Sequence, residues 1–280
     1  MKIGIVGFGF VGKATYLLNC NDIEILVFDI NPKLCIPENL KIEELRECEF
    51  IFISVPTPMS KDGSCHISIV ESVVKDLEKI NFSNFIILRS TVPVGTSDKL
   101  NVHFMPEFLT EKNYEYDFIN NKDWIFGLRG TNEDERFKTQ ITKLFDIAFQ
   151  NFKIKYINLS FVSNSEAEMI KMFRNCFLAT KVGFCNEMYQ FCQFKNINYE
   201  NVRKLACNDD RILHSHSKVP GHDGKLGFGG TCFPKDVNSM IYQISSVGSN
   251  NTILSAVKKR NEEIDRPEQD WNLDTGRAVI

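Results

Sequence analysis

One cysteine, Cys232, has neighbours that could make its thiol a nucleophile. It lies in the segment GFGGTCFPKD (227–236), where glycines precede it and Pro234, Lys235 and Asp236 follow it. Proline fits the first turn of a helix, so the segment predicts a helix that begins beside Cys232. A helix N-terminus and a neighbouring lysine both lower the pKa of a thiol, and the thiolate is the form that attacks a carbonyl carbon. We therefore predict a catalytic nucleophile at Cys232.

Other polar residues that could take part in chemistry lie in three earlier segments. STVPVGT (90–96) follows a predicted strand, and MPEFLTE (105–111) carries two carboxylates four residues apart. Lys171 and Asn175 are also four residues apart within a predicted helix, so their side chains share one helix face. Each of these residues alone would more often be an ordinary surface group, and only their occurrence together argues for a site.

The composition is that of an ordinary globular protein, with 43% hydrophobic and 25% charged residues in 280. A formal net charge of −3 gives no field that would gather nucleic acid or an acidic membrane, so we predict neither partner. The nine cysteines form no CxxC and no Cys/His cluster, so we predict reduced thiols, a cytoplasmic protein and no metal site. The first predicted strand begins at Lys2 and no apolar run has transmembrane length, so we expect neither a signal peptide nor a membrane span. The five histidines carry no motif, and we expect them to be structural or surface residues.

The motif GFGFVG (7–12) has the GxGxxG spacing of a dinucleotide-binding turn and directly follows a predicted strand. In such a turn the first glycine, Gly7, allows the bend. The second, Gly9, lets the backbone approach a pyrophosphate, and the third, Gly12, allows the helix to pack closely. We therefore predict a dinucleotide at this turn.

The residues around the motif favour NAD among the dinucleotides. Amides at the start of the following helix, at Phe10 and Val11, would face the pyrophosphate. The second predicted strand ends in Asp29, at the position where an acidic residue binds the ribose hydroxyls. An acid there repels the extra phosphate of NADP, so we predict NAD, with FAD as the lesser alternative.

Short apolar runs alternate with helical patterns in the first half of the chain, which predicts a parallel sheet with crossover helices. The predicted strands are Lys2–Val6, Glu24–Phe28, Phe50–Val55, Phe85–Arg89, Asn101–Phe104, Trp124–Leu128 and Lys153–Tyr156. The predicted helices are Gly12–Leu18, Ile67–Lys79 and Glu133–Ile147. We therefore assign residues 1–162 to an α/β NAD-binding domain of Rossmann type with a doubly wound parallel sheet.

The pattern changes at Ser163, where SNSE (163–166) offers a capping box and no Gly or Pro follows until Gly183. This stretch predicts one helix of roughly 30 residues, about 45 Å long. The later predicted helices are Val202–Ala206, Asp236–Ser245 and Thr252–Ile264, with an irregular stretch at Pro220–Gly230. We assign residues 163–266 to an all-helical domain that holds the cysteine segment, and residues 267–280 to a loose polar tail.

Taken together, these motifs resemble those of the UDP-glucose/GDP-mannose dehydrogenase family, from Met1 to about Ile264. In order, they are GFGFVG, SVPTP (54–58), STVPVGT, PEFLTE, EAEMIKMFRNCFLATKVGFCNE (166–187), NDDRI (208–212) and GFGGTCFPKD. The resemblance implies a four-electron oxidation of a sugar primary alcohol to a carboxylate with two NAD. UDP-glucose is the favoured substrate and UDP-glucuronate the product, which would serve polysaccharide biosynthesis.

For the first oxidation, the resemblance implies that Lys171 and Asp236 remove the hydroxyl proton while Asn175 helps to hold the oxygen. The Cys232 thiolate then adds to the aldehyde. Lys171 and Asn175 stabilise the alkoxide of the resulting thiohemiacetal.

For the second half of the reaction, the resemblance implies that another oxidation leaves a thioester on Cys232. Water hydrolyses this thioester. Glu107 and Thr91 are the expected activators of the water, with Glu111 as a second carboxylate nearby.

The resemblance also implies two sets of binding residues. The cofactor set is Gly7, Gly9, Phe10, Val11, Gly12, Asp29, Pro56, Thr57, Ser90, Thr91 and Lys235. The substrate set is Phe108, Leu109, Glu111, Lys171, Asn175, Arg211, Phe228 and Gly229. Arg211 matches a family arginine that reaches a substrate in the partner subunit. With Phe184, Met188 and Phe191 on the long helix, it predicts a homodimer.

Typical members of the family continue into a third, C-terminal domain that covers the nucleotide, whereas this sequence stops at Ile280. Three hypotheses follow. The first is a minimal active enzyme with weaker nucleotide binding or a cap from a partner subunit. The second is a noncatalytic NAD-binding homologue that acts through a partner. The third is a dehydrogenase of another nucleotide sugar, such as UDP-N-acetylhexosamine or GDP-mannose.

Overall fold

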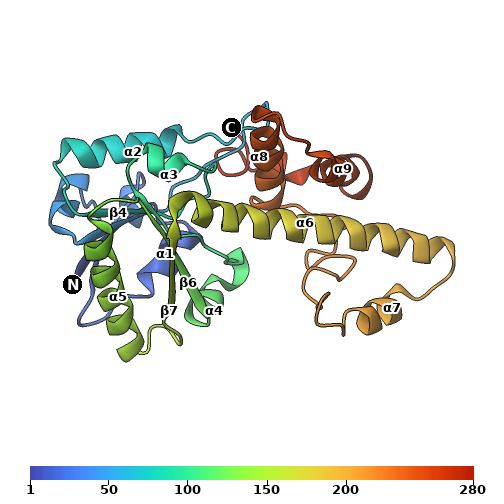
Figure 1. Cartoon of the computed structure of the whole chain (residues 1–280), viewed down its shortest axis with the longest axis horizontal. Coiled ribbons are helices and arrows are strands. Elements are labelled where there is room, and N and C mark those ends of the chain that lie inside the picture. Colours follow the sequence, from blue (N-terminus) through green and yellow to red (C-terminus); the bar gives the residue numbers. More distant parts are fainter. The chain divides into compact units, whose positions relative to one another are not determined.

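The structure, a computed structural model, describes residues 1–280 and divides into two compact units (Figure 1). The first unit comprises residues 1–57 and 67–171, and the second comprises residues 58–66 and 172–280. The predicted boundary at residue 163 differs from this division in two ways. The long helix starts within the first unit because Ala167 and Ile170 pack in that unit's core. The segment Pro58–His66 belongs to the second unit.

A seven-stranded sheet forms the centre of the first unit (Figure 1). Its strands are β1 (Lys2–Val6), β2 (Glu24–Phe28), β3 (Phe50–Ile53), β4 (Phe85–Leu88), β5 (His103–Phe104), β6 (Asp123–Leu128) and β7 (Asn158–Ser163). They are ordered β2-β1-β3-β4-β5-β6-β7, and every neighbouring pair is parallel except β5 and β6. The predicted α/β fold is therefore confirmed, with one antiparallel pair in a mostly parallel sheet.

The last predicted strand is wrong in position, because Lys153–Tyr156 forms no strand and β7 begins at Asn158. Helix α5 (Asp134–Gln150) runs almost up to this stretch, whose Ile154 is buried in the core. The indole Nε1 of Trp124 donates to the Tyr156 carbonyl oxygen at 2.8 Å. The alternation of Ile154 with polar neighbours is also typical of a strand, although the chain here only leads to β7.

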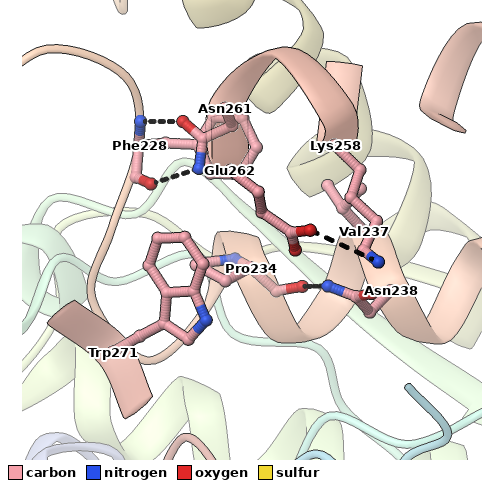
Figure 2. Close-up of a pocket in the computed structure, with 8 residues that line it drawn as sticks. All are labelled: Phe228, Pro234, Val237, Asn238, Lys258, Asn261, Glu262 and Trp271. Atoms are coloured by element: carbon pink, nitrogen blue, oxygen red, sulfur yellow. Dashed lines mark hydrogen bonds and ion pairs between the residues drawn. The ribbon is translucent and has the colours of Figure 1, made fainter. Parts of the chain in front are cut away.

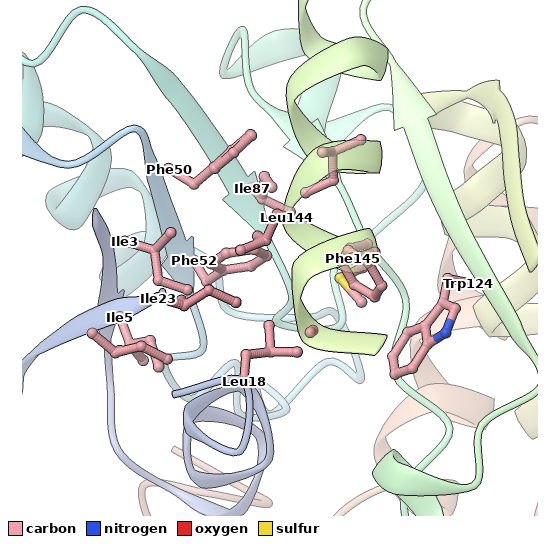
Figure 3. Packing of buried hydrophobic residues seen from close by; sticks show 14 of the residues in the cluster. Ile3, Ile5, Leu18, Ile23, Phe50, Phe52, Ile87, Trp124, Leu144 and Phe145 are labelled. Carbon is pink, nitrogen blue, oxygen red and sulfur yellow. The ribbon is translucent and has the colours of Figure 1, made fainter. Parts of the chain in front are cut away.

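Residues of the central strands point alternately to the two faces of the sheet, as the period of two in a strand requires. Phe50 and Phe52 of β3 lie in one buried cluster, whereas Ile51 and Ile53 lie in the other. Figure 3 shows part of the first cluster, in which Phe52 lies with Leu144 and other apolar side chains. The helices α1 (Phe10–Tyr16), α4 (Tyr114–Ile119) and α5 supply this face; α2 (Ser68–Lys79) and the start of α6 (Asn164–Phe194) supply the other. All four residues of β3 are therefore apolar, because both faces of the sheet are covered.

The second unit is built from helices, as predicted, with one small hairpin added. Its elements are the later part of α6, α7 (Tyr199–Ala206), α8 (Phe233–Ser246), α9 (Thr252–Arg260), a π-helical turn at Asn261–Asp265 and a short 3-10 helix at Asp270–Leu273. One apolar cluster joins Cys176 of α6 to Val237 of α8. A second cluster joins Cys192 to Tyr199 of α7. No helix of the protein combines the length and apolar character needed to cross a membrane.

The prediction of a loose tail at residues 267–280 is wrong. Trp271 and Ala278 are almost fully buried in the second unit. The Met59 amide donates to the Ala278 carbonyl oxygen at 2.8 Å, and the Ile280 amide donates to the Met59 carbonyl oxygen at 3.0 Å. The tail is polar on average, but two of its apolar residues, Trp271 and Ala278, are buried, and this burial orders the segment.

Candidate functional site

Each of the three glycines of the GFGFVG turn is needed for a different structural reason. Gly7 has a φ of +91°, and a Cβ there would lie 2.7 Å from the Ser54 carbonyl oxygen. A Cβ on Gly12 would overlap the Gly7 carbonyl oxygen, so α1 can approach the turn only with glycine at that position. Gly9 has no atom within 4 Å of its would-be Cβ. The backbone at Gly9 is therefore open to a ligand, as a pyrophosphate site requires.

Asp29, at the end of β2, is bonded to the same turn. Its carboxylate accepts from the Phe8 amide at 2.8 Å and from the Asn31 amide at 2.9 Å. Each carboxylate oxygen has two lone pairs, so both bonds leave acceptor capacity for ribose hydroxyls. A cavity of about 390 Å³ opens beside Asp29, with Phe28, Ile30 and Leu40 in its lining. These residues fit an adenosine, with an acid for the sugar and an apolar hollow for the base.

Hydroxyl groups tie together the loops that follow β3 and β4. Thr57 Oγ1 donates to the Thr91 carbonyl oxygen at 2.7 Å, and Ser90 Oγ donates to the Val55 carbonyl oxygen at 2.7 Å. The nearby Ser54 Oγ is buried and has no hydrogen-bond partner. Such an orphaned atom is rare in native proteins and marks a place for a water or ligand. Ser54 was not predicted as a site residue, although it begins the SVPTP motif.

The first unit contains a buried ion pair between Lys171 and Glu107. Lys171 Nζ donates to Glu107 Oε1 at 2.6 Å and to the Glu107 carbonyl oxygen at 2.7 Å. The Leu109 amide donates to Glu107 Oε2 at 2.9 Å, so both carboxylate oxygens are held. The ammonium also lies 5.6 Å from the centre of the Phe108 ring. A carboxylate and an ammonium fixed at this distance can exchange a proton with a reacting group between or beside them.

A second buried cation, Arg89, was not predicted as a site residue. Its side chain is 2% exposed, and Nη1 donates to Thr15 Oγ1 of α1 at 2.5 Å. Burial lowers the pKa of Arg89 to about 10, while the negative charge of Glu107 acts in the opposite direction. Glu107 therefore lies in the field of two cations. The sequence signal was a charged residue at the end of an apolar strand, directly before Ser90.

In the second unit, Cys232 is the N-cap residue of α8, and its side chain is half-buried. Thr231 Oγ1 lies 3.7 Å from its sulfur. Pro234 stands at the start of the helix, which begins at Phe233. The structure thus places this thiol at a helix N-terminus, where the helix dipole favours the thiolate.

Lys235 and Asp236, in the first turn of α8, form a buried pair. Lys235 Nζ donates to Asp236 Oδ1 at 2.6 Å, and Asn175 Nδ2 donates to Asp236 Oδ2 at 2.6 Å. Burial alone would lower the pKa of Lys235, but Asp236, Cys65 and Cys232 raise it above its ordinary value. Lys235 therefore remains a cation in the field of the Cys232 sulfur.

Cys176, unlike the half-buried Cys232, is a buried cysteine whose thiol has a raised pKa. Its sulfur lies 3.9 Å from the Asp236 carbonyl oxygen, deep in the apolar cluster of the second unit. Burial raises the pKa of Cys176 to about 12, with a smaller contribution from the charge of Asp236. This thiol is protonated at neutral pH and cannot act as a nucleophile.

The loop that leads to Cys232 is held by Asn261 and Arg266, two buried residues that follow α9. Figure 2 shows Asn261 with its two bonds to Phe228. Asn261 Oδ1 accepts from the Phe228 amide at 2.8 Å, and Asn261 Nδ2 donates to the Phe228 carbonyl oxygen at 2.9 Å. Arg266 Nε donates to the Leu226 carbonyl oxygen at 3.1 Å, and a Cβ on Gly229 would overlap its guanidinium. Neither Asn261 nor Arg266 was predicted, because each binds backbone far away in the sequence.

The predicted site residues thus form two groups, one in each unit. The first unit brings together the dinucleotide turn with Asp29, the loops of Thr57 and Thr91, and the pair of Glu107 and Lys171. The second unit brings together Asn175, Cys232, Lys235 and Asp236. Two predicted substrate residues lie at the surface: Glu111 is exposed, and Arg211 is exposed and paired with Asp209 at 2.6 Å.

Comparison with known proteins identifies both halves of the chain. Residues 38–146 match the NAD binding domain of the UDP-glucose/GDP-mannose dehydrogenase family, and residues 165–263 match the central domain of the same family.

Two curated relatives are named UDP-glucose 6-dehydrogenase. The UDP-glucose 6-dehydrogenase of Campylobacter jejuni is 28% identical over 94% of this chain and 72% of its own length. The UDP-glucose 6-dehydrogenase of Pseudomonas aeruginosa is 32% identical over 78% of this chain and 49% of its own length. The chain therefore spans between about half and three quarters of the length of these two relatives.

A solved structure supports the fold. The UDP-glucose dehydrogenase of Pyrobaculum islandicum superposes with a TM-score of 0.78 at 23% identity, covering 93% of this chain and 68% of that protein.

Proposed function

Since the chain belongs to the UDP-glucose/GDP-mannose dehydrogenase family, we propose that it oxidises a nucleotide-activated sugar with NAD. The proposed reaction converts the primary alcohol of UDP-glucose to the carboxylate of UDP-glucuronate, a precursor for polysaccharide biosynthesis. The observation that carries the proposal is the N-cap position of Cys232 beside the buried cation Lys235. A thiol so placed is suited to covalent capture of an aldehyde.

In the first oxidation the hydroxyl of the sugar loses its proton and its carbon loses a hydride. NAD, when bound at the Gly7–Gly12 turn, accepts the hydride in both oxidations. We assign proton removal to Lys171 and Asp236, each of which is held by a buried partner of opposite charge. Asn175, already bonded to Asp236, has a second amide hydrogen with which to hold the substrate oxygen.

The Cys232 thiolate then forms a C–S bond with the aldehyde carbon, and the carbonyl electrons move to oxygen as an alkoxide. Lys171 and Asn175 are the proposed donors to that alkoxide. Loss of the second hydride restores the C=O bond and leaves a thioester. Covalent attachment keeps the reactive aldehyde from escaping.

Hydrolysis completes the reaction. Water adds to the thioester carbon, the C–S bond breaks, and the thiolate returns to Cys232. We assign activation of this water to Glu107 and Thr91. One water and two NAD are consumed, and one carboxylate, two NADH and three protons are formed, so atoms and electrons balance.

We also propose that two copies of the chain pair through α6. Phe177, Phe184 and Phe191 recur at intervals of seven residues, and each is more than half exposed. This spacing is typical of helices that pack against each other along their length. A row of exposed aromatic side chains marks a surface at which another protein chain binds. Met188, in contrast, packs within the second unit. Phe184→Glu should convert a dimer to a monomer in sedimentation velocity, and a monomeric parent protein would refute the pairing.

The test of function is NADH formation from a panel of nucleotide sugars at saturating concentration. Two NADH per UDP-glucose support the double oxidation, and one would indicate a simple alcohol dehydrogenase. Preference for UDP-N-acetylhexosamine or GDP-mannose would change the substrate and keep the chemistry. No NADH from any sugar would refute the enzyme and leave a noncatalytic NAD-binding homologue that acts through a partner. The cytoplasmic location stays a prediction from the sequence.

A further inference from the structure

Glu168 of α6 is a fully buried carboxylate that the proposed chemistry does not use. It accepts from the Gly95 amide at 2.5 Å, from the Ser97 amide at 2.8 Å and from Ser97 Oγ at 2.7 Å. All three of these donors are neutral. Burial raises the pKa of Glu168, while the bonds from Ser97 and Gly95 act in the opposite direction. A buried carboxylate is costly for a fold, so its three bonds to one short segment indicate a specific structural task.

The donors form a small anion-binding hollow at the end of the STVPVGT segment. Gly95 has a φ of +92° and caps the short helix α3 (Thr96–Lys99). The Gly95 and Ser97 amides converge on one anion, while the Thr96 amide between them donates to the Pro93 carbonyl oxygen. Here the protein's own carboxylate fills the hollow, so Glu168 anchors this end of the segment to α6.

The beginning of the same segment is held by hydroxyl bonds. Ser90 Oγ donates to the Val55 carbonyl oxygen, and the Thr91 carbonyl oxygen accepts from Thr57 Oγ1, both at 2.7 Å. The segment that contains Thr91 is therefore held at its start by the loop after β3 and at Gly95 and Ser97 by Glu168.

One turn further along α6, Lys171 holds Glu107 through its carboxylate and its carbonyl oxygen. Residues three apart on a helix lie on the same side, so Glu168 and Lys171 act from neighbouring positions on one rigid element. The first turns of α6 thus hold the segment of Thr91 and the carboxylate of Glu107. These two residues are the proposed activators of the hydrolytic water.

We infer that Glu168 is a positioning residue that sets Thr91 relative to Glu107 for hydrolysis of the thioester. This inference rests on the proposed function. A group that acts on hydrolysis alone leaves both oxidations intact. Its loss therefore makes the acyl-enzyme on Cys232 accumulate.

The test compares Glu168→Gln with the full-length parent protein. The amide of glutamine keeps the shape of the side chain but loses the charge and one acceptor. We expect the steady-state rate of NADH formation to fall about tenfold to a hundredfold, as for a displaced catalytic group. The apparent KM for NAD and for UDP-glucose should fall by about the same factor, because slowing a step after the second oxidation lowers kcat and leaves kcat/KM unchanged. Intact-mass spectrometry during turnover should show a sugar-acyl adduct on Cys232.

Two further variants separate positioning from general damage. Glu166→Gln changes an exposed carboxylate two residues away, bonded only locally to Ser163 in the structure, and should leave the rate unchanged. Ser97→Ala removes one of the three donors to Glu168 and should slow the enzyme in the same direction by a smaller factor. It carries the test if Glu168→Gln fails to fold. Hydrogen exchange of the Gly95 and Ser97 amides should be slow in the parent and faster in Glu168→Gln.

The possible failures are distinct. Parent-like turnover in Glu168→Gln, or slower turnover without an acyl adduct, overturns the positioning role and leaves the proposed function standing. Absence of NADH formation by the parent protein overturns the proposed function, and the positioning role fails with it.

Discussion

Each unit buries a lysine against a carboxylate, but the two pairs are held in different ways. In the first unit, Lys171 binds both the side chain and the backbone of Glu107. In the second unit, Asp236 accepts from two side chains, those of Lys235 and Asn175. The first pair is fixed to a loop that leaves the sheet, and the second consists of side chains at the start of a helix.

This difference teaches how each unit sets up its part of a reaction. Backbone contacts give positions that the sheet determines, which suits groups that must hold a water or a cofactor in place. Side-chain contacts around a helix N-terminus give a cluster of charges, which suits control of a thiol. The following changes would break or sharpen this comparison.

The largest expected effect is the loss of the thiol in the second unit. Cys232→Ser should lower turnover about 10⁶-fold, as removal of a covalent nucleophile does, and should stop the reaction after the first oxidation. Rapid-quench counting of NADH per active site should give one rather than two. Cys20→Ser, in the first unit, is the matched control and should keep parent turnover. An unchanged rate in Cys232→Ser would remove this thiol from the mechanism.

The next effect compares the two buried carboxylates directly. Asp236→Asn leaves Lys235 as a buried cation without its counter-charge, which should cost about 3–5 kcal/mol of unfolding free energy. Glu107→Gln should cost less, about 1–3 kcal/mol, because Lys171 keeps its bond to the Glu107 carbonyl oxygen.

The two tryptophans make this comparison measurable, since Trp124 lies in the first unit and Trp271 in the second. Denaturant unfolding of single-tryptophan versions, made with Trp124→Phe or Trp271→Phe, follows one unit at a time. If Asp236→Asn and Glu107→Gln lower the unfolding free energy equally, the bond from Lys171 to the Glu107 carbonyl oxygen does not contribute to stability.

A smaller effect concerns His103, which is buried in the first unit. Its Nδ1 lies 3.0 Å from the Gly127 carbonyl oxygen, and its ring stacks on Phe137. Burial lowers the pKa of His103 from 6.5 to about 4, so the folded unit binds this proton less readily than the unfolded chain. The part of the unfolding free energy that depends on His103 is fully present above pH 6.5. It is lost as the pH falls towards 4, and the loss is at most about 3 kcal/mol.

The measurement is the unfolding free energy against pH, followed through Trp124. His103→Phe should remove this part of the slope, whereas His214→Gln, at the surface, should keep it. A slope that persists in His103→Phe would assign the proton to another group. The transition followed through Trp271 should not depend on His103 if the units unfold separately.

Much of the fold could be predicted because the strands of the first unit are buried on both faces. Runs such as Phe50–Ile53 are apolar throughout, and this pattern is hard to mistake. The same rule failed for Ile154, because one buried residue is not a strand. The prediction for the tail failed because it used the mean polarity of residues 267–280. Trp271 and Ala278 are each buried singly, which a mean value does not reveal.

The site could be predicted where chemistry and local spacing coincide. Pro234 beside Cys232 predicted the helix start, and GFGFVG predicted the turn. Glu168, Asn261 and Arg266 could not be found in this way, because each binds the backbone of a segment distant in the sequence. Nothing in the residue type of such a side chain tells which amide it will meet.

The hairpin at Pro58–His66 has a consequence for the order in which the chain can fold. Its Met59 bonds on both sides to the last residues of the chain, Ala278 and Ile280. During synthesis the hairpin leaves the ribosome long before those partners exist, while the strands of the first unit find theirs much sooner. Since domains form as units and from the N-terminal end, the Rossmann-type unit can close first. The unit that carries the thiol can close only after residues 278–280 have been made, so its hairpin stays unpaired for longer than the strands of the first unit.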